Sequence, residues 1–267
     1  MYIAALTIVT SLLYVAATVA IGARLWLDDD RGPARSTVLA LSAAAVGTHV
    51  VVVAEAIWVQ GGVNLSFFSA LSLVAWVTST GVVVASLRER IEHLGILLWP
   101  LAALTTPLTL LAGPEPTLEM APALKAHVVI SMIAYATLLA AVLQAFILAA
   151  LDYRLRHRRA TGFVRRLPAL RTMEKQLFWL VTVGFIALTI ALASGLGFFG
   201  HRVLEGALIH KTSLSIASWL TFGILLLGHA IWGWRGQTAI RWTVVGFLAL
   251  MLGYFGSKFV LELILQG

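Results

Sequence analysis

The sequence contains no cysteine, and only 12% of its 267 residues are charged. The absence of cysteine excludes disulfides, thiolate metal sites and thiol–disulfide exchange. The shortage of charge excludes a soluble fold, because a water-soluble protein of this length could not cover its surface with so few charged groups. Apolar residues make up 60% of the chain, so lipid is the solvent that this composition fits.

The formal net charge of the chain is +7. The basic residues lie in short segments between apolar stretches rather than on one face, so the positive balance does not indicate nucleic acid as a partner. No grouping of side chains is typical of a catalytic site either, and we predict no enzymatic activity.

Hydropathy divides the chain into eight apolar stretches, each about long enough to cross the hydrocarbon core as a helix. The predicted spans cover residues 2–26, 37–60, 66–87, 94–111, 123–151, 177–200, 207–229 and 241–264. The longest polar segment, from Asp152 to Gln176, separates the fifth span from the sixth. We therefore predict an all-α, polytopic helical bundle that forms a single transmembrane domain over residues 1–267.

Lysine and arginine are distributed unevenly between the two sides of this arrangement. One side carries Arg24, Arg31, Arg35, Arg88, Arg90, Arg154, Arg156, Arg158, Arg159, Arg165, Arg166, Arg171, Lys175, Arg235 and Arg241. The other side carries only Lys125, Arg202, Lys211 and Lys258. Because the basic side of a membrane protein normally faces the cytoplasm, we predict that both termini lie outside the bacterial cytoplasmic (inner) membrane. The basic loop at about 152–176 is then cytoplasmic.

Single cysteines at Gly162 and Gly113 test this topology, since the natural chain offers no competing thiol. Gly162 lies in the predicted cytoplasmic loop and Gly113 in a predicted outer loop. We expect a membrane-impermeant thiol reagent to label the two positions from opposite sides of the membrane. Labelling of both from outside would contradict the eight-span arrangement.

Two histidines take equivalent positions near the outer ends of predicted helices. His127 lies about one turn into the fifth span and His210 about one turn into the seventh. Imidazoles that face each other across a helical bundle commonly hold haem iron or another metal. The pair therefore predicts a b-type haem with His127 and His210 as iron ligands, and with Lys211 placed to meet a propionate. Helix-end capping and interfacial hydrogen bonding are the alternative for both histidines.

His49 lies about midway along the second span, where polar side chains are costly and usually functional. One interpretation is a neutral imidazole that contributes to an inner cavity and to cofactor binding. The other is a hydrogen bond to a backbone carbonyl or to a serine or threonine across a helix contact. Of the remaining histidines, we expect His93 and His157 to be solvated loop residues and His229 to be interfacial.

Several segments, in a fixed order, carry a resemblance to a known family. They are Leu124-Lys125-Ala126-His127-Val128, His49 with Asn64-Leu65-Ser66-Phe67-Phe68, Trp219-Leu220-Thr221-Phe222, Trp234-Arg235-Gly236 and Tyr254-Phe255-Gly256. From about residue 40 onward this pattern resembles the CcsA/CcmC-type cytochrome c assembly proteins. Arg171-Thr172-Met173-Glu174 and Ile209-His210-Lys211-Thr212 are similar to the short YpjD-type branch of that family.

The chain also departs from the family pattern. Members that deliver haem to apocytochrome c carry an outer tryptophan-rich segment ending in Trp-Asp-Pro, whereas residues 194–212 here contain neither tryptophan nor aspartate. The family's second outer histidine is absent after Gly256, and Leu227 stands in the place of its second membrane histidine. The resemblance therefore implies an accessory haem-binding membrane protein, with lipid and other membrane or cytochrome-assembly proteins as partners.

Two further functions fit the sequence. A transporter or ion-flux accessory protein without haem would use His49, Glu55 and the outer charges to line a path. A structural partner of another membrane complex would dock through the basic segment 152–176. A Soret band in the purified protein would distinguish haem binding from both.

Overall fold

The computed structural model describes residues 2–27, 31–59, 62–111, 121–157, 163, 166–200 and 206–259. Its helices are α1 (Tyr2–Trp26), α2 (Arg35–Ile57), α3 (Phe67–Ser86), α4 (Gly95–Leu108), α5 (Pro122–Arg156), α6 (Leu170–Phe199), α7 (Gly206–Trp232) and α8 (Gln237–Met251). Short 3₁₀ turns, Glu92–Leu94 and Thr109–Leu111, extend α4, and a π-helix, Leu252–Gly256, continues α8. A small antiparallel hairpin, β1 (Trp58–Val59) and β2 (Gly62–Val63), follows α2.

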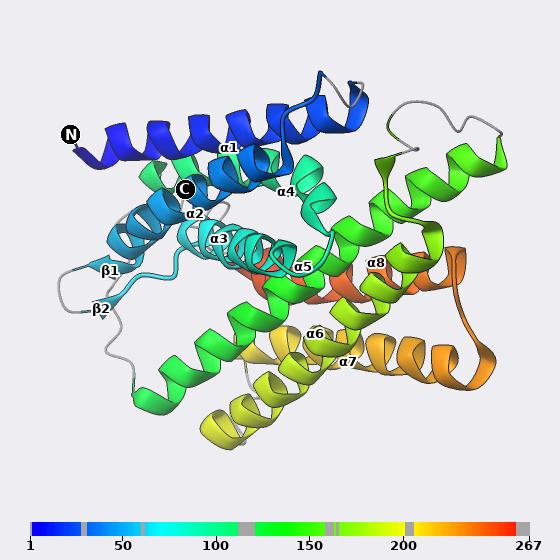
Figure 1. Ribbon diagram of the computed structural model, residues 1–267. Helices are drawn as coiled ribbons and strands as arrows, with labels where there is room; N and C mark the ends of the chain where they lie inside the picture. Colours follow the sequence, from blue (N-terminus) through cyan, green and yellow to red (C-terminus); the bar gives the residue numbers. More distant parts are fainter. Residues whose placement is uncertain are drawn as a thin grey trace. The chain divides into compact units, whose positions relative to one another are not determined.

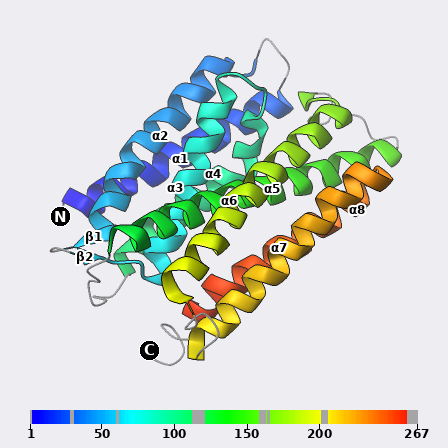
Figure 2. The same ribbon diagram turned by 90° about the horizontal axis from the view of Figure 1, so that it is seen from below.

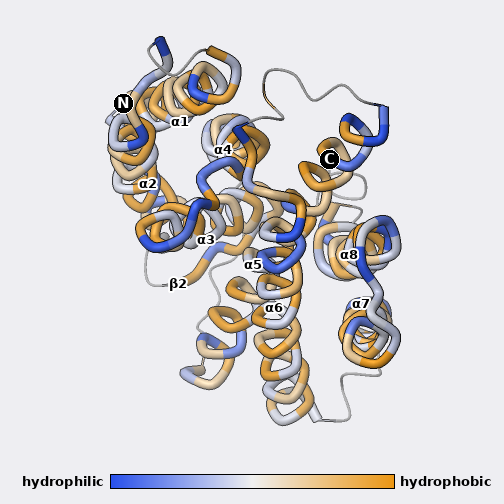
Figure 3. Tube along the Cα trace, turned by 45° about the vertical axis from the view of Figure 1, so that its right-hand side comes forward, coloured by the Kyte–Doolittle hydropathy of each residue, from blue (hydrophilic) through white to orange (hydrophobic). Residues whose placement is uncertain are grey.

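Within this part of the chain, eight helices are long and apolar enough to cross a membrane. The predicted all-α, polytopic fold is therefore confirmed. Figure 3 shows apolar residues along the helices, with hydrophilic residues mostly at the helix ends and in the connections. This pattern is the one that a lipid environment requires, because every backbone polar group in the hydrocarbon must be satisfied inside its own helix.

The helices on either side of the basic segment are longer than predicted. α5 continues to Arg156, where the Arg156 Nε lies 3.0 Å from the Asp152 carboxylate one turn earlier. α6 begins at Leu170, seven residues before the predicted start of the sixth span. Hydropathy finds only the apolar part of a helix, so it assigned these polar terminal turns to a 152–176 loop.

The chain forms two compact units. Unit 1 comprises residues 1–119 and 151–169, and unit 2 comprises residues 120–150 and 170–267. In unit 1, α1 packs on α2 and α4, and α3 packs on the same two helices, so the four form a closed bundle (Figure 1). In unit 2, α6 packs on α7, and α7 lies along α8 and the π-helix (Figure 2).

Candidate functional site

His127 lies near the start of α5 and is held by α6. It is five residues after Pro122, which begins the helix, and therefore about 7.5 Å along the axis at 1.5 Å per residue. Its half-buried imidazole places Nδ1 2.9 Å from the Ser194 hydroxyl oxygen. The predicted site residue at the fifth span thus has a fixed orientation relative to the sixth.

The hydrogen bonds of Ser194 favour one tautomer of His127. The Ser194 hydroxyl donates its one hydrogen to the carbonyl oxygen of Ala191, 2.9 Å away. It can then accept from His127, an arrangement in which the imidazole proton is on Nδ1 and the lone pair is on Nε2. Histidines that bind metals are oriented by this kind of hydrogen bond from the other ring nitrogen.

Gly195 allows the imidazole to lie close to α6. A Cβ atom at this position would be 3.1 Å from His127 Cε1, which is closer than ordinary van der Waals contact. Gly197, on the same helix, has no atom within 4 Å of the corresponding position. Of these two glycines, Gly195 is the one that His127 requires.

The other predicted residues of this site lie on α7. His210 is four residues after Gly206, which begins the helix, and its side chain is exposed. The Lys211 ammonium lies 5.7 Å from the centre of the Tyr254 ring, a cation–π distance. His127 therefore contacts α6 through Ser194, and Lys211 contacts the π-helix through Tyr254, whereas the His210 side chain is exposed on α7.

The π-helix coincides with the Tyr254-Phe255-Gly256 segment that carried part of the family resemblance. Tyr135 of α5 donates from its hydroxyl to the Leu250 carbonyl at 2.9 Å, and its ring packs against Tyr254 and Phe255. π-turns within α-helices are frequent at functional positions. Tyr135 belongs to the part of the fifth span that resembles the family, but neither hydropathy nor spacing predicts its bond to a carbonyl 115 residues away.

In unit 1, His49 is fully buried and bonded to three other helices. Its Nδ1 lies 3.0 Å from the Tyr14 hydroxyl, and its Nε2 lies 2.9 Å from Ser72 Oγ and 3.3 Å from Thr106 Oγ1. Thr106 donates to the Ala102 carbonyl, so it can only accept from the imidazole. His49 thus has a hydroxyl partner at each ring nitrogen, Tyr14 at Nδ1 and both Ser72 and Thr106 at Nε2. Since both nitrogens are used within the protein, we do not include His49 in the haem site proposed below.

His93 differs from its prediction. It belongs to the Glu92–Leu94 turn and is only 3% exposed, whereas His157 is exposed as predicted. The α3–α4 connection packs into the bundle through the buried side chains of Ile91 and Leu94, and this carries His93 inward. The prediction of a solvated loop for His93 is therefore wrong.

The chain is similar to known proteins over most of its length. Residues 35–265 match the family described as cytochrome C assembly protein. The chain belongs to this family. It is 32% identical over 231 residues to the inner membrane protein YpjD of Escherichia coli K12, which covers 86% of each chain. It is 31% identical over 225 residues to an uncharacterized 28.8 kDa protein of Azospirillum brasilense, covering 79% of this chain and 82% of that one. No solved structure matches.

Membership of the cytochrome c assembly family confirms the resemblance, and with the eight spans it places the chain in the bacterial inner membrane as a multi-pass protein.

The family match begins at Arg35, so α1 lies outside it. That helix nevertheless supplies Tyr14, the partner of His49 Nδ1. The polar centre of unit 1 is therefore completed by a helix that the family segment does not include.

Two family segments meet at the opposite end of unit 2 from His127. The Glu174 carboxylate accepts the Gly236 backbone N–H at 3.0 Å, and Gly236 adopts a positive φ of 54° that favours glycine. His229 stacks on Phe178 and bonds through Nδ1 to the Trp234 carbonyl. These contacts fix the turn between α7 and α8 and give the Arg171–Glu174 and Trp234–Gly236 segments a structural role.

Proposed function

We propose that this protein binds a b-type haem where α5 and α7 begin, and that it acts as an accessory haem-handling protein in cytochrome c assembly. The observation that carries the proposal is the contact of His127 Nδ1 with the Ser194 hydroxyl at 2.9 Å, which orients the ring and favours the tautomer with its lone pair on Nε2. Nε2 is the imidazole nitrogen through which histidine commonly binds haem iron. Family membership supports haem handling in general, and the His127 geometry supports this location for it.

The donor set at this end of unit 2 fits a haem. His127 is a neutral nitrogen ligand with an oriented ring, and His210 is a second imidazole at a similar distance from the start of its own helix. The Lys211 ammonium is a suitable partner for a propionate carboxylate. With the N-out topology that the basic residues favour, this end of the unit faces the outside of the inner membrane.

The test is the absorption spectrum of the protein, purified after expression with haem supplied. We expect a Soret band, a low-spin spectrum from two imidazole ligands and a pyridine haemochrome spectrum of b-type. His210→Ala should retain the Soret band and shift the iron toward high spin. A wild-type protein without haem would contradict the proposal and leave the transporter and docking functions.

The glycines of α6 provide a matched pair of variants. Gly195→Ala introduces a methyl group 3.1 Å from His127 Cε1, so the ring must move and Nε2 must change direction. We expect haem affinity to fall by up to about tenfold, the lower end of the effect of disturbing a ligand's orienting contacts. Gly197→Ala, where the added methyl meets open space, should bind as the wild type does. Equal haem affinities of the two variants, measured by titration with haem, would contradict this role of Gly195.

A further inference from the structure

α3 carries a row of buried serines on the face that points into unit 1. Ser72, Ser79 and Ser86 are spaced seven residues apart and are all fully buried. Seven residues are close to two helical turns, so the three hydroxyls lie on one face at intervals of about 10.5 Å. The row extends from the level of His49 to the end of the helix.

Three polar atoms along this row lack a partner. Ser79 Oγ, Ser86 Oγ and the indole Nε1 of Trp99 are buried and have no hydrogen-bond partner among the residues that the structure describes. Ser79 lies beside the Tyr14 hydroxyl, which is the partner of His49 Nδ1. An unsatisfied polar group in a membrane interior costs several kcal/mol, so groups of this kind normally bind ordered water.

These atoms occupy a continuous part of the bundle. Ser72 and Thr106 contact the same nitrogen of His49, so they mark one level on α3 and α4. α3 and α4 run in opposite directions. Ser79 is seven residues after Ser72 on α3, and Trp99 is seven residues before Thr106 on α4. The backbone positions of Trp99 and Ser79 therefore lie at about the same level on adjacent helices, about 10 Å from His49 along the axis. The indole ring of Trp99 extends from there along α4 and lies against Gly95, one turn further from His49.

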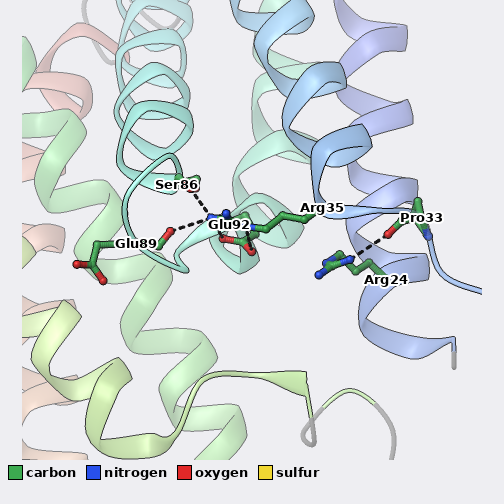
Figure 4. Close-up of polar contacts among 6 residues, drawn as sticks. All are labelled: Arg24, Pro33, Arg35, Ser86, Glu89 and Glu92. Carbon is green, nitrogen blue, oxygen red and sulfur yellow. Dashed lines mark hydrogen bonds and ion pairs between the residues drawn. The ribbon is translucent and has the colours of Figure 1, made fainter. Parts of the chain in front are cut away.

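The far end of the row is polar as well. Figure 4 shows the Arg35 guanidinium beside Ser86, where it donates to the Ser86 carbonyl and, at 3.1 Å, to the Glu89 carbonyl. Its Nε lies 2.9 Å from the Glu92 carboxylate. The side chain of Arg35 is about one-third exposed, so this end of the row borders the aqueous phase.

We propose that unit 1 holds a file of ordered water along this row, running from the Arg35–Glu92 end past Ser86, Ser79 and Trp99 to the Tyr14–His49 pair. Water supplies the missing partners of the three unsatisfied atoms. The interval between Ser86 and Ser79 needs roughly two or three molecules at about 2.8 Å per hydrogen bond. The file connects the imidazole at mid-membrane depth to one face of the membrane, and it is independent of the haem site in unit 2.

The first test compares two indole N–H groups in the wild-type protein. Trp76 Nε1 donates to the Val46 carbonyl at 3.1 Å and is only half-buried, whereas Trp99 is fully buried. If water solvates Trp99, its indole proton should exchange with D₂O before that of Trp76, as followed by NMR of the indole-¹⁵N-labelled protein. Slower exchange at Trp99, the order that a dry interior predicts, would overturn the proposal.

The second test uses the absence of cysteine. In Ser79→Cys, the S–H stretch is the only thiol band in the infrared spectrum. It should shift to S–D soon after transfer to D₂O, and its frequency should show a hydrogen-bonded thiol. Val74→Cys is the control, because it is buried and lies about 140° around α3 from Ser79, and it should exchange much more slowly. Equal rates in the two variants would overturn the proposal, and the indole measurement decides the matter if Ser79→Cys does not fold.

Discussion

Replacing His127 by alanine should abolish the Soret band of the haem-loaded protein, or reduce it to the level of free haem in detergent. The variant loses the nitrogen ligand that α6 orients, and the exposed His210 does not have an orienting contact of this kind among the described residues. His157→Ala is the matched control, because this histidine lies just after the end of the same helix and is exposed. An unchanged band in His127→Ala would exclude this residue as a ligand.

Ser194 variants separate ligation from packing at the same site. Ser194→Ala keeps His127 but removes the hydroxyl that lies 2.9 Å from its Nδ1, and loss of such a partner typically lowers metal affinity by about 10- to 100-fold. Ser194→Thr retains the hydroxyl and should bind haem nearly as the wild type does. If Ser194→Ala and Ser194→Thr bind equally, the hydrogen bond does not orient the ligand.

Replacing His49 by leucine should destabilise the protein while leaving its helices in place. The change removes the hydrogen bonds to Tyr14, Ser72 and Thr106, and the Tyr14 and Ser72 hydroxyls lose their imidazole partner inside the bundle. Side-chain hydrogen bonds in membranes contribute about 0.6 kcal/mol on average, and an unsatisfied buried group costs about 1–3 kcal/mol. We therefore expect a loss of about 2–3 kcal/mol in the free energy of unfolding, measured by denaturation in mixed detergent micelles. His49→Gln, which keeps a donor and an acceptor, should lose less.

A double-mutant cycle with Tyr14→Phe tests the cause of this loss. If the Tyr14–His49 hydrogen bond carries part of it, Tyr14→Phe should cost stability in the wild type and little in His49→Leu. Additive losses would show that the two residues act independently and that His49 contributes through its contacts on Nε2 or through packing. The cycle also measures how strongly α1, which lies outside the family match, is coupled to the rest of unit 1.

The sequence predicted the membrane fold because length and hydropathy are local properties. Each predicted span corresponds to a helix, and the family resemblance is confirmed. The polar ends of α5 and α6 were not predicted, since turns such as Leu170–Gln176 contain too few apolar residues for hydropathy to identify a helix. The N-out orientation, the haem and the partner of the basic segment remain predictions.

The site was less predictable because it depends on contacts between residues far apart in the sequence. His127 was identified from its position in a span, but Ser194, whose hydroxyl contacts its Nδ1, is 67 residues away on another helix. Tyr14 was missed for the same reason. His49 was placed correctly at mid-membrane depth, and only the structure shows that its nitrogens bond to Tyr14, Ser72 and Thr106.

The π-helix at Leu252–Gly256 has a consequence for how this chain is aligned with its relatives. A π-turn accommodates about one residue more than an α-turn, which rotates every later side chain by roughly 100° about the helix axis. Ser257 and Lys258 therefore face directions that an uninterrupted α-helix would give to neighbouring sequence positions. In a relative with a regular helix here, the side chain that points in the same direction as Lys258 is found one position away from Lys258 in the alignment. Deletion of one residue inside the turn should preserve the directions of the residues after it, whereas the same deletion earlier in α8 would rotate them.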